Sequence, residues 1–490
     1  MNRLVSVLAI VSGLGLLACS DPDAAEPWRP SDVIFISLDT LRADHLRVYG
    51  YDRPISPHID ALAADAALFE RAYTQASHTL IAHASVLTGL YPERHGADHQ
   101  EGALAPGVVT LAEVLAGAGY QTGGFVNALW LTPRFNMERG FQTFDYEGTL
   151  DQQKRSAEET NRAIFEWVDR LGDAPYFLFA HYYDVHSDWE RLPYDAPAEY
   201  LDRIAGPEPP GFEAGDGELW ATRHLMRRIA RRELFDEDDL RYVERLYDAG
   251  IAYTDAQVGR LLEGLRERGR LDRAIIVLTS DHGEEFQEHG RLIHTQVYEE
   301  TVRVPLLVSM PEMRGSGSHG CRDHPEGFRA SRIPQLVQHV DLLPTLTECL
   351  GVEGPDGLQG TSLLAALAGG DVSPAAAYFV SPAGFALGRQ RGVVRGGWKL
   401  VELDEGGPRR LFHLAEDPEE QRDLSGLHPE KVAALARELD RHRGEHGEKR
   451  TASEKVELSG EERAALRALG YFTELEGGVA RSPGGSDGSR

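Results

Sequence analysis

The chain has 490 residues, of which 41% are hydrophobic, and its formal net charge at pH 7 is −27. This length is enough for one large hydrophobic core with a smaller appended domain. The negative charge argues against a nucleic acid partner, because the long-range field of the protein repels a polyanion. Three cysteines are too few for a disulfide scaffold, and whether Cys321 and Cys349 pair stays open.

The N-terminus has the features of a bacterial targeting segment. Arg3 gives a short positive region, and residues 4–17 form an apolar run. At about 14 residues, this run is too short to span a bilayer comfortably. The sequence Leu16-Leu17-Ala18-Cys19 resembles the lipobox of bacterial lipoproteins.

This resemblance implies that residues 1–18 are a lipoprotein signal peptide and that Cys19 is the lipidated N-terminus of the mature protein. An ordinary signal peptide cut near Ala18, or a short anchor left in place, is the alternative. The polar residues 19–31 then form a tether. We expect a lipid-anchored protein of the bacterial cell envelope, on the periplasmic or the outer-membrane face.

Strand and helix patterns alternate over the next 340 residues or so, which predicts an α/β fold with a parallel sheet covered on both faces. The predicted buried strands are short apolar runs at 33–38, 125–126, 176–180, 274–278 and 305–308. The predicted helices cover 57–69, 110–118 and 238–268. Ligands of such sheets gather beyond the carboxyl ends of the strands. Asp39, His186 and Asp281 each follow a predicted strand, so we expect one cleft to hold all three.

The pattern changes after about residue 370. Two runs, 396–401 and 411–414, predict a strand pair, and residues 429–442 predict a helix that completes a small α+β module. A further short helix is predicted over 458–472. The Gly/Ser-rich residues 476–490 are expected to be disordered.

The segment from Ser77 to Gly96 contains the predicted nucleophile. Thr79 precedes an apolar, Ala-rich helical run that Gly89 and Pro92 end. A hydroxyl at this position faces unpaired backbone N–H groups, where a sulfate or phosphate group would bind. A plain helix N-cap is the alternative role for a threonine at this position.

This segment resembles the signature of the sulfatase family, part of the alkaline phosphatase superfamily, whose pattern is C/S-x-P-S-R followed by an apolar pair and Thr-Gly. Aligning Thr88 and Gly89 with the end of the pattern puts Thr79 at the Cys or Ser of the family and His83 at the Arg. The family oxidises its Cys or Ser to an aldehyde, which a threonine cannot form. The resemblance therefore implies that Thr79 attacks as a plain alkoxide, as in the phosphate-ester members of the superfamily.

The resemblance also implies a fold and a division of the chain. The fold is an alkaline phosphatase/sulfatase-like parallel-sheet sandwich with a small C-terminal α+β subdomain. Residues 32–370 would form the catalytic domain, and residues 371–475 would form the C-terminal subdomain and its helix.

Two segments resemble the metal-binding segments of the family. Asp39 lies in the first of them, where Thr40 replaces the second acid, and Asp281-His282 forms the second pair. With the Thr79 oxygen, these residues would make a four-ligand site for one divalent ion. An imidazole among the ligands, with one acid missing, favours Mn²⁺, Zn²⁺ or Mg²⁺ over Ca²⁺.

Further residues are assigned roles by the same resemblance. His294 stands where sulfatases place a lysine that holds the transferred group, and His186 would protonate the leaving group. His83 and His294 would stabilise charge on the ester oxygens. Asn127 lies where many sulfatases have a sulfate-binding Lys and His, and it would serve as a neutral donor.

We therefore expect a metal-dependent hydrolase of phosphoryl or sulfuryl esters, with phosphate diesters or phosphonate esters preferred. The substrate would be a small-molecule, glycan or lipid ester, and the N-terminal lipid would hold the protein at a membrane. The alternatives are a true sulfuric ester hydrolase and an inactive, envelope-anchored binding protein of the same fold.

Overall fold

The computed structural model describes residues 31–460 with several gaps. The gaps are residues 100, 147–154, 188–191, 213–224, 226–227, 229–230, 232, 317–319, 325–326, 373–375, 382–387, 404–405, 448–450, 452–453 and 458. The predicted signal peptide, Cys19, the tether up to residue 30 and the C-terminal tail lie outside the described residues. Almost all of the predicted helix 458–472 lies outside them too.

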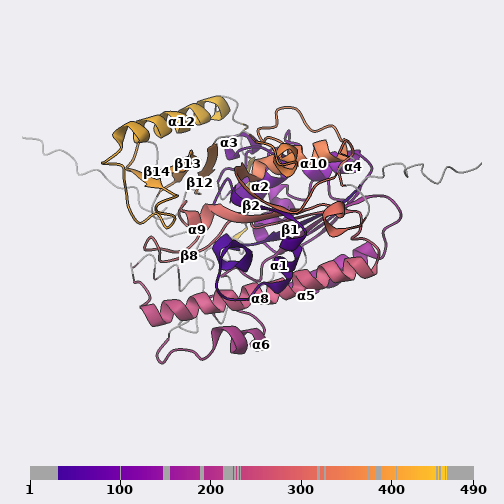
Figure 1. Ribbon diagram of the computed structural model, residues 1–490, viewed down its shortest axis with the longest axis horizontal. Helices are drawn as coiled ribbons and strands as arrows, with labels where there is room; N and C mark the ends of the chain where they lie inside the picture. Colours follow the sequence, from indigo (N-terminus) through magenta and orange to yellow (C-terminus); the bar gives the residue numbers. More distant parts are fainter. Residues whose placement is uncertain are drawn as a thin grey trace, which may run out of the picture.

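An eight-stranded sheet forms the centre of the main domain, in the order β11-β2-β10-β7-β1-β6-β4-β5 (Figure 1). Its strands are β1 (Asp32–Leu38), β2 (Ala67–Tyr73), β4 (Gln121–Phe125), β5 (Thr143–Asp145), β6 (Tyr176–Tyr182), β7 (Ala274–Thr279), β10 (Arg303–Ser309) and β11 (Ser331–Gln338). Among these strands only β10 runs antiparallel to its neighbours, β7 and β2. The other pairs are parallel, which confirms the predicted fold class.

Strand β1 lies in the middle of this sheet, and all seven of its residues are buried. Val33 and Phe35 belong to the core on one face of the sheet, whereas Ile34 and Ile36 belong to the core on the other face. Successive side chains of a strand point to opposite faces, so a strand in a sheet that is covered on both sides is apolar at most of its positions and does not alternate with polar residues.

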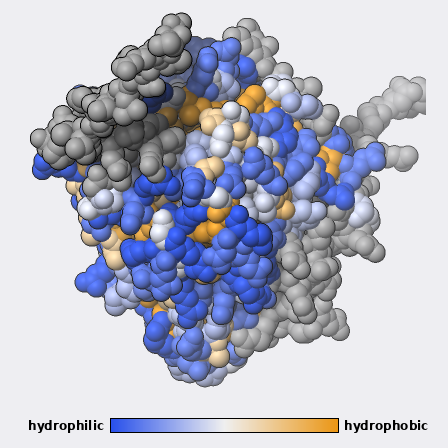
Figure 2. Space-filling model, turned by 90° about the vertical axis from the view of Figure 1, so that its right-hand side faces the viewer, coloured by the Kyte–Doolittle hydropathy of each residue, from blue (hydrophilic) through white to orange (hydrophobic). Residues whose placement is uncertain are grey.

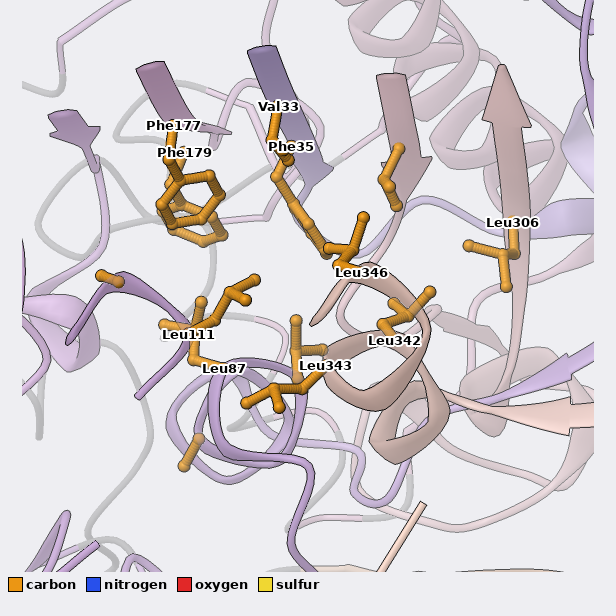
Figure 3. Packing of buried hydrophobic residues seen from close by; sticks show 14 of the residues in the cluster. Val33, Phe35, Leu87, Leu111, Phe177, Phe179, Leu306, Leu342, Leu343 and Leu346 are labelled. Atoms are coloured by element: carbon orange, nitrogen blue, oxygen red, sulfur yellow. The ribbon is translucent and has the colours of Figure 1, made fainter. Parts of the chain in front are cut away.

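Helices cover both faces and make a three-layer sandwich (Figure 1). On one face lie α2 (Thr79–Thr88), α4 (Leu111–Gly117) and α10 (Leu342–Leu350). In Figure 3, Leu87, Leu111 and Leu343 of these helices lie opposite the phenylalanines of β1 and β6. The other face carries α1 (Pro57–Ala64), α5 (Ala157–Val168) and the long α8 (Glu237–Glu267). In the described part of the chain, no helix combines the length and apolar character needed to cross a membrane.

Two predicted elements differ from the structure in their bounds. The run 57–69, predicted as one helix, is a helix only to Ala64, and β2 begins at Ala67. Short apolar runs fit either structure, and the run contains no Gly or Pro after its first residue to mark the change. The strand predicted at 125–126 begins earlier in the structure, at Gln121. The prediction missed its first residues because Gly123 interrupts the apolar pattern of the sequence. A Cβ atom at Gly123 would lie 2.7 Å from the Trp167 ring, so packing excludes a larger residue there.

The C-terminal subdomain is an antiparallel sheet with one helix. Its strands are β12 (Ala376–Val380), β13 (Gln390–Arg395), β14 (Trp398–Leu403) and β15 (Arg409–His413), and its helix is α12 (Pro429–Gly447). Leu400 and Leu411 pack against Leu435 and Leu439 of α12. β14 and β15 pair as predicted. The remaining short elements are α3 (Pro92–His95), α6 (Ala198–Tyr200), α9 (Glu299–Val302), α11 (Leu364–Leu367), β3 (Gly102–Ala103), β8 (Glu285–Phe286), β9 (Leu292–Ile293) and β16 (Glu454–Lys455).

A buried group of charged residues joins the subdomain to the main domain, and we call it the junction cluster. Lys399 of β14 places its Nζ 3.0 Å from Glu299 Oε1 and 3.1 Å from Glu420 Oε2. His289 lies 2.7 Å from Glu300 Oε1 through Nδ1 and 3.2 Å from the Glu420 carbonyl through Nε2. The cluster thus connects the second sheet to the segment between β8 and β9.

Cys321 and Cys349 form a disulfide, which settles a pairing that the sequence left open. The bond closes a loop with a sequence separation of 28 and ties the connection before β11 to the end of α10. Disulfides persist in oxidising compartments such as the bacterial periplasm.

The outer surface agrees with the charge of the chain. Figure 2 shows one face that is mainly hydrophilic, with smaller hydrophobic areas between the polar residues. Isolated hydrophobic residues on a surface are normal, so this face by itself indicates no partner.

Candidate functional site: a buried metal-ligand group beside Thr79

The candidate site lies at the carboxyl edge of the central sheet. β1 pairs in parallel with β6 and β7, so these three strands end at the same edge. Asp39 follows β1, and its backbone N–H donates to the Tyr182 carbonyl at the end of β6. Asp281 and His282 follow β7. The topology therefore joins residues that are more than 240 positions apart in the sequence.

Asp39, Asp281 and His282 form a group that could hold a metal ion. Each offers one ligand atom, all three atoms lie within 4.8 Å of one another, and all three residues are buried. Two backbone N–H groups, those of Thr40 (3.2 Å) and His282 (2.9 Å), donate to Asp281 Oδ1. Asp281 Oδ2 accepts no hydrogen bond from any described residue.

The electrostatics of Asp281 suit a cation ligand. Burial acts to raise the pKa of this carboxyl, but the neighbouring rings of His282, His83 and His181 lower it to about 2. The carboxylate is therefore ionised at neutral pH and buried. Two carboxylates and one imidazole, with Asp281 Oδ2 accepting no hydrogen bond from a described residue, fit a divalent metal ion.

Thr40, which follows Asp39, has a strained backbone. Its φ is 57°, a left-handed value that a β-branched residue rarely adopts. The conformation is held by Tyr247 of α8, whose hydroxyl donates to the Thr40 carbonyl (2.7 Å) and accepts from the Arg42 N–H (2.8 Å). Such strain persists only where the surroundings impose it, and here it turns the Thr40 N–H toward Asp281.

Thr79 is the first residue of α2 and borders the ligand group. Its Oγ1 lies 3.4 Å from His282 Nε2, and the residue is 1% exposed. Every residue of α2 is buried, and Gly89 ends the helix with a φ of 65°. This left-handed backbone favours glycine, and a Cβ atom there would lie 2.9 Å from a terminal methyl of Leu358. The segment around Thr79 is thus fixed at both of its ends.

His83 lies one turn along α2 from Thr79 and uses both ring nitrogens inside the protein. Nδ1 lies 2.8 Å from the Thr79 carbonyl, and Nε2 lies 2.8 Å from the Ser37 hydroxyl. A ring that donates from Nδ1 must accept at Nε2, so this geometry fits a neutral imidazole. Burial lowers the pKa of His83 to about 4. These contacts differ from the expected contact with an ester oxygen, because they connect α2 to β1.

The side-chain N–H groups of Asn127 also donate to other residues of the protein. Its Nδ2 donates to Thr160 Oγ1 and to the His181 carbonyl, each at 2.9 Å. Its backbone N–H donates to His181 Nδ1 (3.3 Å), while His181 Nε2 lies 3.0 Å from Asp39 Oδ2. Asn127 therefore contacts His181, which in turn contacts Asp39. This position differs from the expected role of Asn127 as a donor to the substrate.

His186 and His294 lie together beside the ligand group. The His294 ring is 4.4 Å from the His282 ring and 5.2 Å from the His186 ring, measured between centroids. His186 stacks on Tyr183 at 4.4 Å, which fixes the plane of its imidazole. The hairpin of β8 and β9 leads into His294, and Ile293 has a φ of 75° just before it.

Three further buried residues belong to the site, and the sequence pattern assigned them no role. Glu284 Oε1 lies 3.4 Å from His294 Nδ1. His78 precedes Thr79, its ring lies 4.9 Å from Trp130, and burial together with His282 and His294 lowers its pKa well below the ordinary value. His339 Nε2 lies 2.9 Å from Thr279 Oγ1 at the end of β7. The sequence signal for Glu284 was its closeness to His282, and the signal for His78 was its position next to Thr79. No neighbouring residue in the sequence pointed to His339.

The comparisons with known proteins agree with this arrangement. The family described as Sulfatase matches residues 31–352, and the family described as N-sulphoglucosamine sulphohydrolase, C-terminal, matches residues 287–445. A curated N-acetylglucosamine-6-O-sulfatase of Bacteroides thetaiotaomicron is 23% identical, with 86% of this chain and 87% of that protein aligned.

Solved structures share the fold. The phosphonate monoester hydrolase of Agrobacterium radiobacter superposes with a TM-score of 0.68 and 21% identity, over 88% of this chain and 99% of that chain. A protein in complex with its substrate D-glucosamine-2-N,6-O-disulfate superposes with a TM-score of 0.69 and 19% identity, over 86% and 99%.

A mostly parallel sheet carries a buried group of two aspartates and a histidine at its carboxyl edge, and the family match assigns this chain to the hydrolases of the alkaline phosphatase superfamily. Within that superfamily, the chain belongs to the sulfatase family. The family resemblance read from the Thr79 segment is thereby confirmed.

Proposed function

We propose that the chain is a metal-dependent hydrolase of phosphoryl or sulfuryl esters with Thr79 as its nucleophile. The observation that carries this proposal is the buried Thr79 hydroxyl, which lies 3.4 Å from His282 beside Asp39 and Asp281. A divalent ion held by these three side chains and Thr79 would lower the pKa of the hydroxyl and polarise an ester oxygen.

The protein residues supply the remaining steps. The Thr79 hydroxyl first loses its proton to solvent, the resulting alkoxide Oγ1 attacks the phosphorus or sulfur in line, and the bond to the leaving oxygen breaks as the bond to Oγ1 forms. His186 gives a proton to the departing alcohol, while His294 stabilises the equatorial oxygens. Water then attacks the phosphorus or sulfur of the Thr79 adduct and gives a proton to His186, while the bond to Oγ1 breaks and returns the Thr79 alkoxide. His83 and Asn127 act by holding α2 and His181 in place.

We propose phosphate diesters or phosphonate esters as the preferred substrates, because Thr79 cannot supply the aldehyde hydrate used for sulfate esters. A relative by fold hydrolyses phosphonate monoesters, which supports this preference. The alternative, a sulfuric ester hydrolase, is favoured by the named relatives that act on sulfated glucosamine, and it would make the substrate a sulfated glycan. An inactive binding protein would not need the intact ligand group.

The test is a panel of four substrates: p-nitrophenyl sulfate, p-nitrophenyl phosphate, bis(p-nitrophenyl) phosphate and p-nitrophenyl phenylphosphonate. Each is assayed with Mn²⁺, Zn²⁺, Mg²⁺ or Ca²⁺. Thr79→Ser should keep substantial activity, whereas Thr79→Ala should lose at least ~10³-fold in kcat, because the covalent route is removed. Thr88→Ala, at the other end of α2, is the matched control and should stay near wild type. If the sulfate ester reacts faster than every phosphoryl ester, the proposed preference for phosphate diesters or phosphonate esters is wrong. If no substrate reacts, the assignment as an enzyme is wrong.

We also propose that Cys19 carries the lipid that anchors the mature protein in the cell envelope. The lipobox-like sequence supports this location, and the Cys321–Cys349 disulfide is compatible with an oxidising compartment. The mature protein should carry acyl chains on Cys19 in intact-mass measurement. A mature N-terminus beyond Cys19 without acyl chains would count against the anchor.

A further inference from the structure

His181 is a buried histidine near the carboxyl end of β6, and no step of the proposed hydrolysis uses its ring. Residues of a strand alternate between the two faces, so His181 shares the face of Phe177 and Phe179. Figure 3 shows these two phenylalanines on the side of the sheet that α2 covers. The His181 ring accordingly lies 5.2 Å from the His83 ring of α2. An imidazole that is 0% exposed at such a position needs partners for its nitrogens.

The hydrogen bonds of His181 determine which of its nitrogens carries the proton. The backbone N–H of Asn127 can only donate, and it donates to His181 Nδ1 (3.3 Å), so Nδ1 is the acceptor and carries no proton. The proton of the ring is therefore on Nε2, which lies 3.0 Å from Asp39 Oδ2. The side chain of Asn127 also donates to the His181 carbonyl (2.9 Å) and holds the residue in place. His181 thus donates a hydrogen bond to one oxygen of a predicted metal ligand.

The second carboxylate of the ligand group is restricted in a similar way. Asp281 Oδ1 accepts from the N–H groups of Thr40 (3.2 Å) and His282 (2.9 Å), and a carboxylate oxygen has two lone pairs. Both lone pairs of Oδ1 are thereby used, so Asp281 can bind an ion through Oδ2. Backbone groups impose the restriction on Asp281, whereas a side chain imposes the one on Asp39. A substitution of His181 can therefore remove the restriction on Asp39 and leave the other intact.

The number of oxygens that each carboxylate offers affects which ions fit the group. Ca²⁺ takes about six to eight oxygen ligands and often uses both oxygens of a carboxylate, whereas Zn²⁺ takes about four ligands and accepts nitrogen among them. Asp39, Asp281, His282 and the Thr79 hydroxyl offer one atom each. Without the hydrogen bond from His181, Asp39 could offer its second oxygen as well, which is the change that Ca²⁺ requires.

We propose that His181 is a positioning residue that sets the metal preference of the site, because its N–H restricts Asp39 to one coordinating oxygen and so disfavours Ca²⁺. This inference rests on the metal-ligand group of the proposed function, but it depends neither on the kind of ester nor on Thr79 as the nucleophile. Loss of the His181 donor should therefore change the preference between two ions, and not only the strength of binding.

Metal binding to the full-length protein, after removal of bound metal with a chelator, tests the proposal without turnover. The dissociation constants of Zn²⁺ and Ca²⁺ are measured by competition with chromophoric chelators, and their ratio is compared between variants. His181→Phe keeps a ring but has no donor, so the preference for Zn²⁺ over Ca²⁺ should fall at least ~10-fold. His181→Gln offers an amide N–H to Asp39 and an amide oxygen to Asn127, so it should restore most of the wild-type ratio.

His95→Phe is the matched control, because it makes the same change at a buried histidine whose ring nitrogens contact Ser85 and Ala97. It should leave the ratio of the two dissociation constants unchanged. Unfolding midpoints identify a variant that fails to fold. If His181→Phe fails, His181→Asn replaces it, because the shorter amide can accept from Asn127 but does not reach Asp39. A crystal structure of the Zn²⁺-loaded wild type needs no variant, and it should show Asp39 bound through one oxygen with His181 Nε2 on the other.

The opposite results overturn the proposal. These are an unchanged ratio in His181→Phe, equal weakening of both ions in that variant, an equal change of the ratio in His95→Phe, and no restoration by His181→Gln. A wild type that prefers Ca²⁺, or an Asp39 that binds Zn²⁺ through both oxygens, also contradicts it. A wild type that binds neither ion refutes the metal-dependent function as well, whereas a wild type that binds Zn²⁺ with a ratio independent of His181 refutes this inference alone.

Discussion

At the scale of the residue, Asp281 has the most contacts that bear on the metal site. Its Oδ1 accepts from two backbone N–H groups, and its Oδ2 accepts no hydrogen bond from a described residue and lies 3.3 Å from His282 Nε2. We predict that Asp281→Ala lowers metal affinity by more than ~100-fold, because changes even to residues behind a ligand cost 10–100-fold. Metal content after dialysis, measured by elemental analysis, checks this.

The matched control for Asp281 is Asp32, another buried aspartate, at the opposite end of the central strands. Asp32 accepts from the Tyr176 N–H (3.1 Å), a contact that an asparagine can keep. Asp32→Asn should therefore retain the metal. An Asp281→Ala protein that keeps a full equivalent of metal would show that the ligand group is misassigned.

The hydrogen bonds and burial of His95 favour its neutral form in the folded protein, so His95 makes the stability of the fold depend on pH. The Ala97 N–H donates to Nδ1 (3.2 Å), and Nε2 lies 3.0 Å from Ser85 Oγ. Burial lowers the pKa of His95 to about 3, against about 6.5 in the unfolded chain. The unfolded state binds the proton first, so the stability that wild type gains from His95 falls as the pH drops below 6.5.

The measurement compares wild type with His95→Gln by urea unfolding at two pH values. Between about pH 7.5 and about pH 5, the wild-type advantage in free energy of unfolding should shrink by about 2 kcal/mol. An advantage that is the same at both pH values would mean that His95 takes up a proton in the folded state.

The site residues differ in how far the sequence could predict them. Asp39, Asp281 and His282 follow strands, and parallel strands bring such positions to one edge, so their meeting could be predicted. The partners of His83 could not, because its contact with Ser37 depends on how α2 packs on β1. Glu284 likewise approaches His294 only through the hairpin of β8 and β9.

At the scale of the element, the Cys321–Cys349 disulfide holds α10 to the segment before β11. We predict that replacing both cysteines by serine lowers the free energy of unfolding by about 3–4 kcal/mol, the chain-entropy value for a loop of this length. Chemical unfolding with and without reductant checks this. Reductant should destabilise wild type to a similar extent and leave the serine variant unchanged, and a serine variant as stable as oxidised wild type would contradict it.

Long periodic elements were predictable and ambiguous apolar runs were not. α8 was predicted within one residue at each end, because its apolar positions recur at helical spacing over eight turns or more. The direction of β10 could not be read, since a buried apolar strand has the same pattern whether it is parallel or antiparallel. The break between α1 and β2 was missed because a short apolar run fits a helix as well as a strand.

At the scale of the whole molecule, the junction cluster joins the two sheets through Lys399, which is fully buried. Burial acts to lower the pKa of Lys399, but Glu299 and Glu420 raise it above its ordinary value, so the ammonium stays charged. We predict that Lys399→Met costs about 3–5 kcal/mol of stability, because it leaves buried carboxylates without their cation.

Lys455 provides the control for Lys399. It pairs with Glu101 at 3.0 Å, but its side chain is 70% exposed, so Lys455→Met should cost less than ~1 kcal/mol. Adding Glu420→Gln to Lys399→Met should restore part of the loss in urea unfolding. Equal effects of the two lysine substitutions would show that the cluster contributes no more than a surface pair.

The place of β1 in the sheet also sets the order of events during synthesis. Both partners of β1 come later in the chain, β6 roughly 140 residues and β7 roughly 240 residues further on. At about 5–20 residues per second, a nascent chain therefore exposes a mostly apolar strand for many seconds. A ribosome-bound chain that ends before β7 should be held by chaperones and should bind no metal, because two of the three residues of the ligand group, Asp281 and His282, have not yet been made.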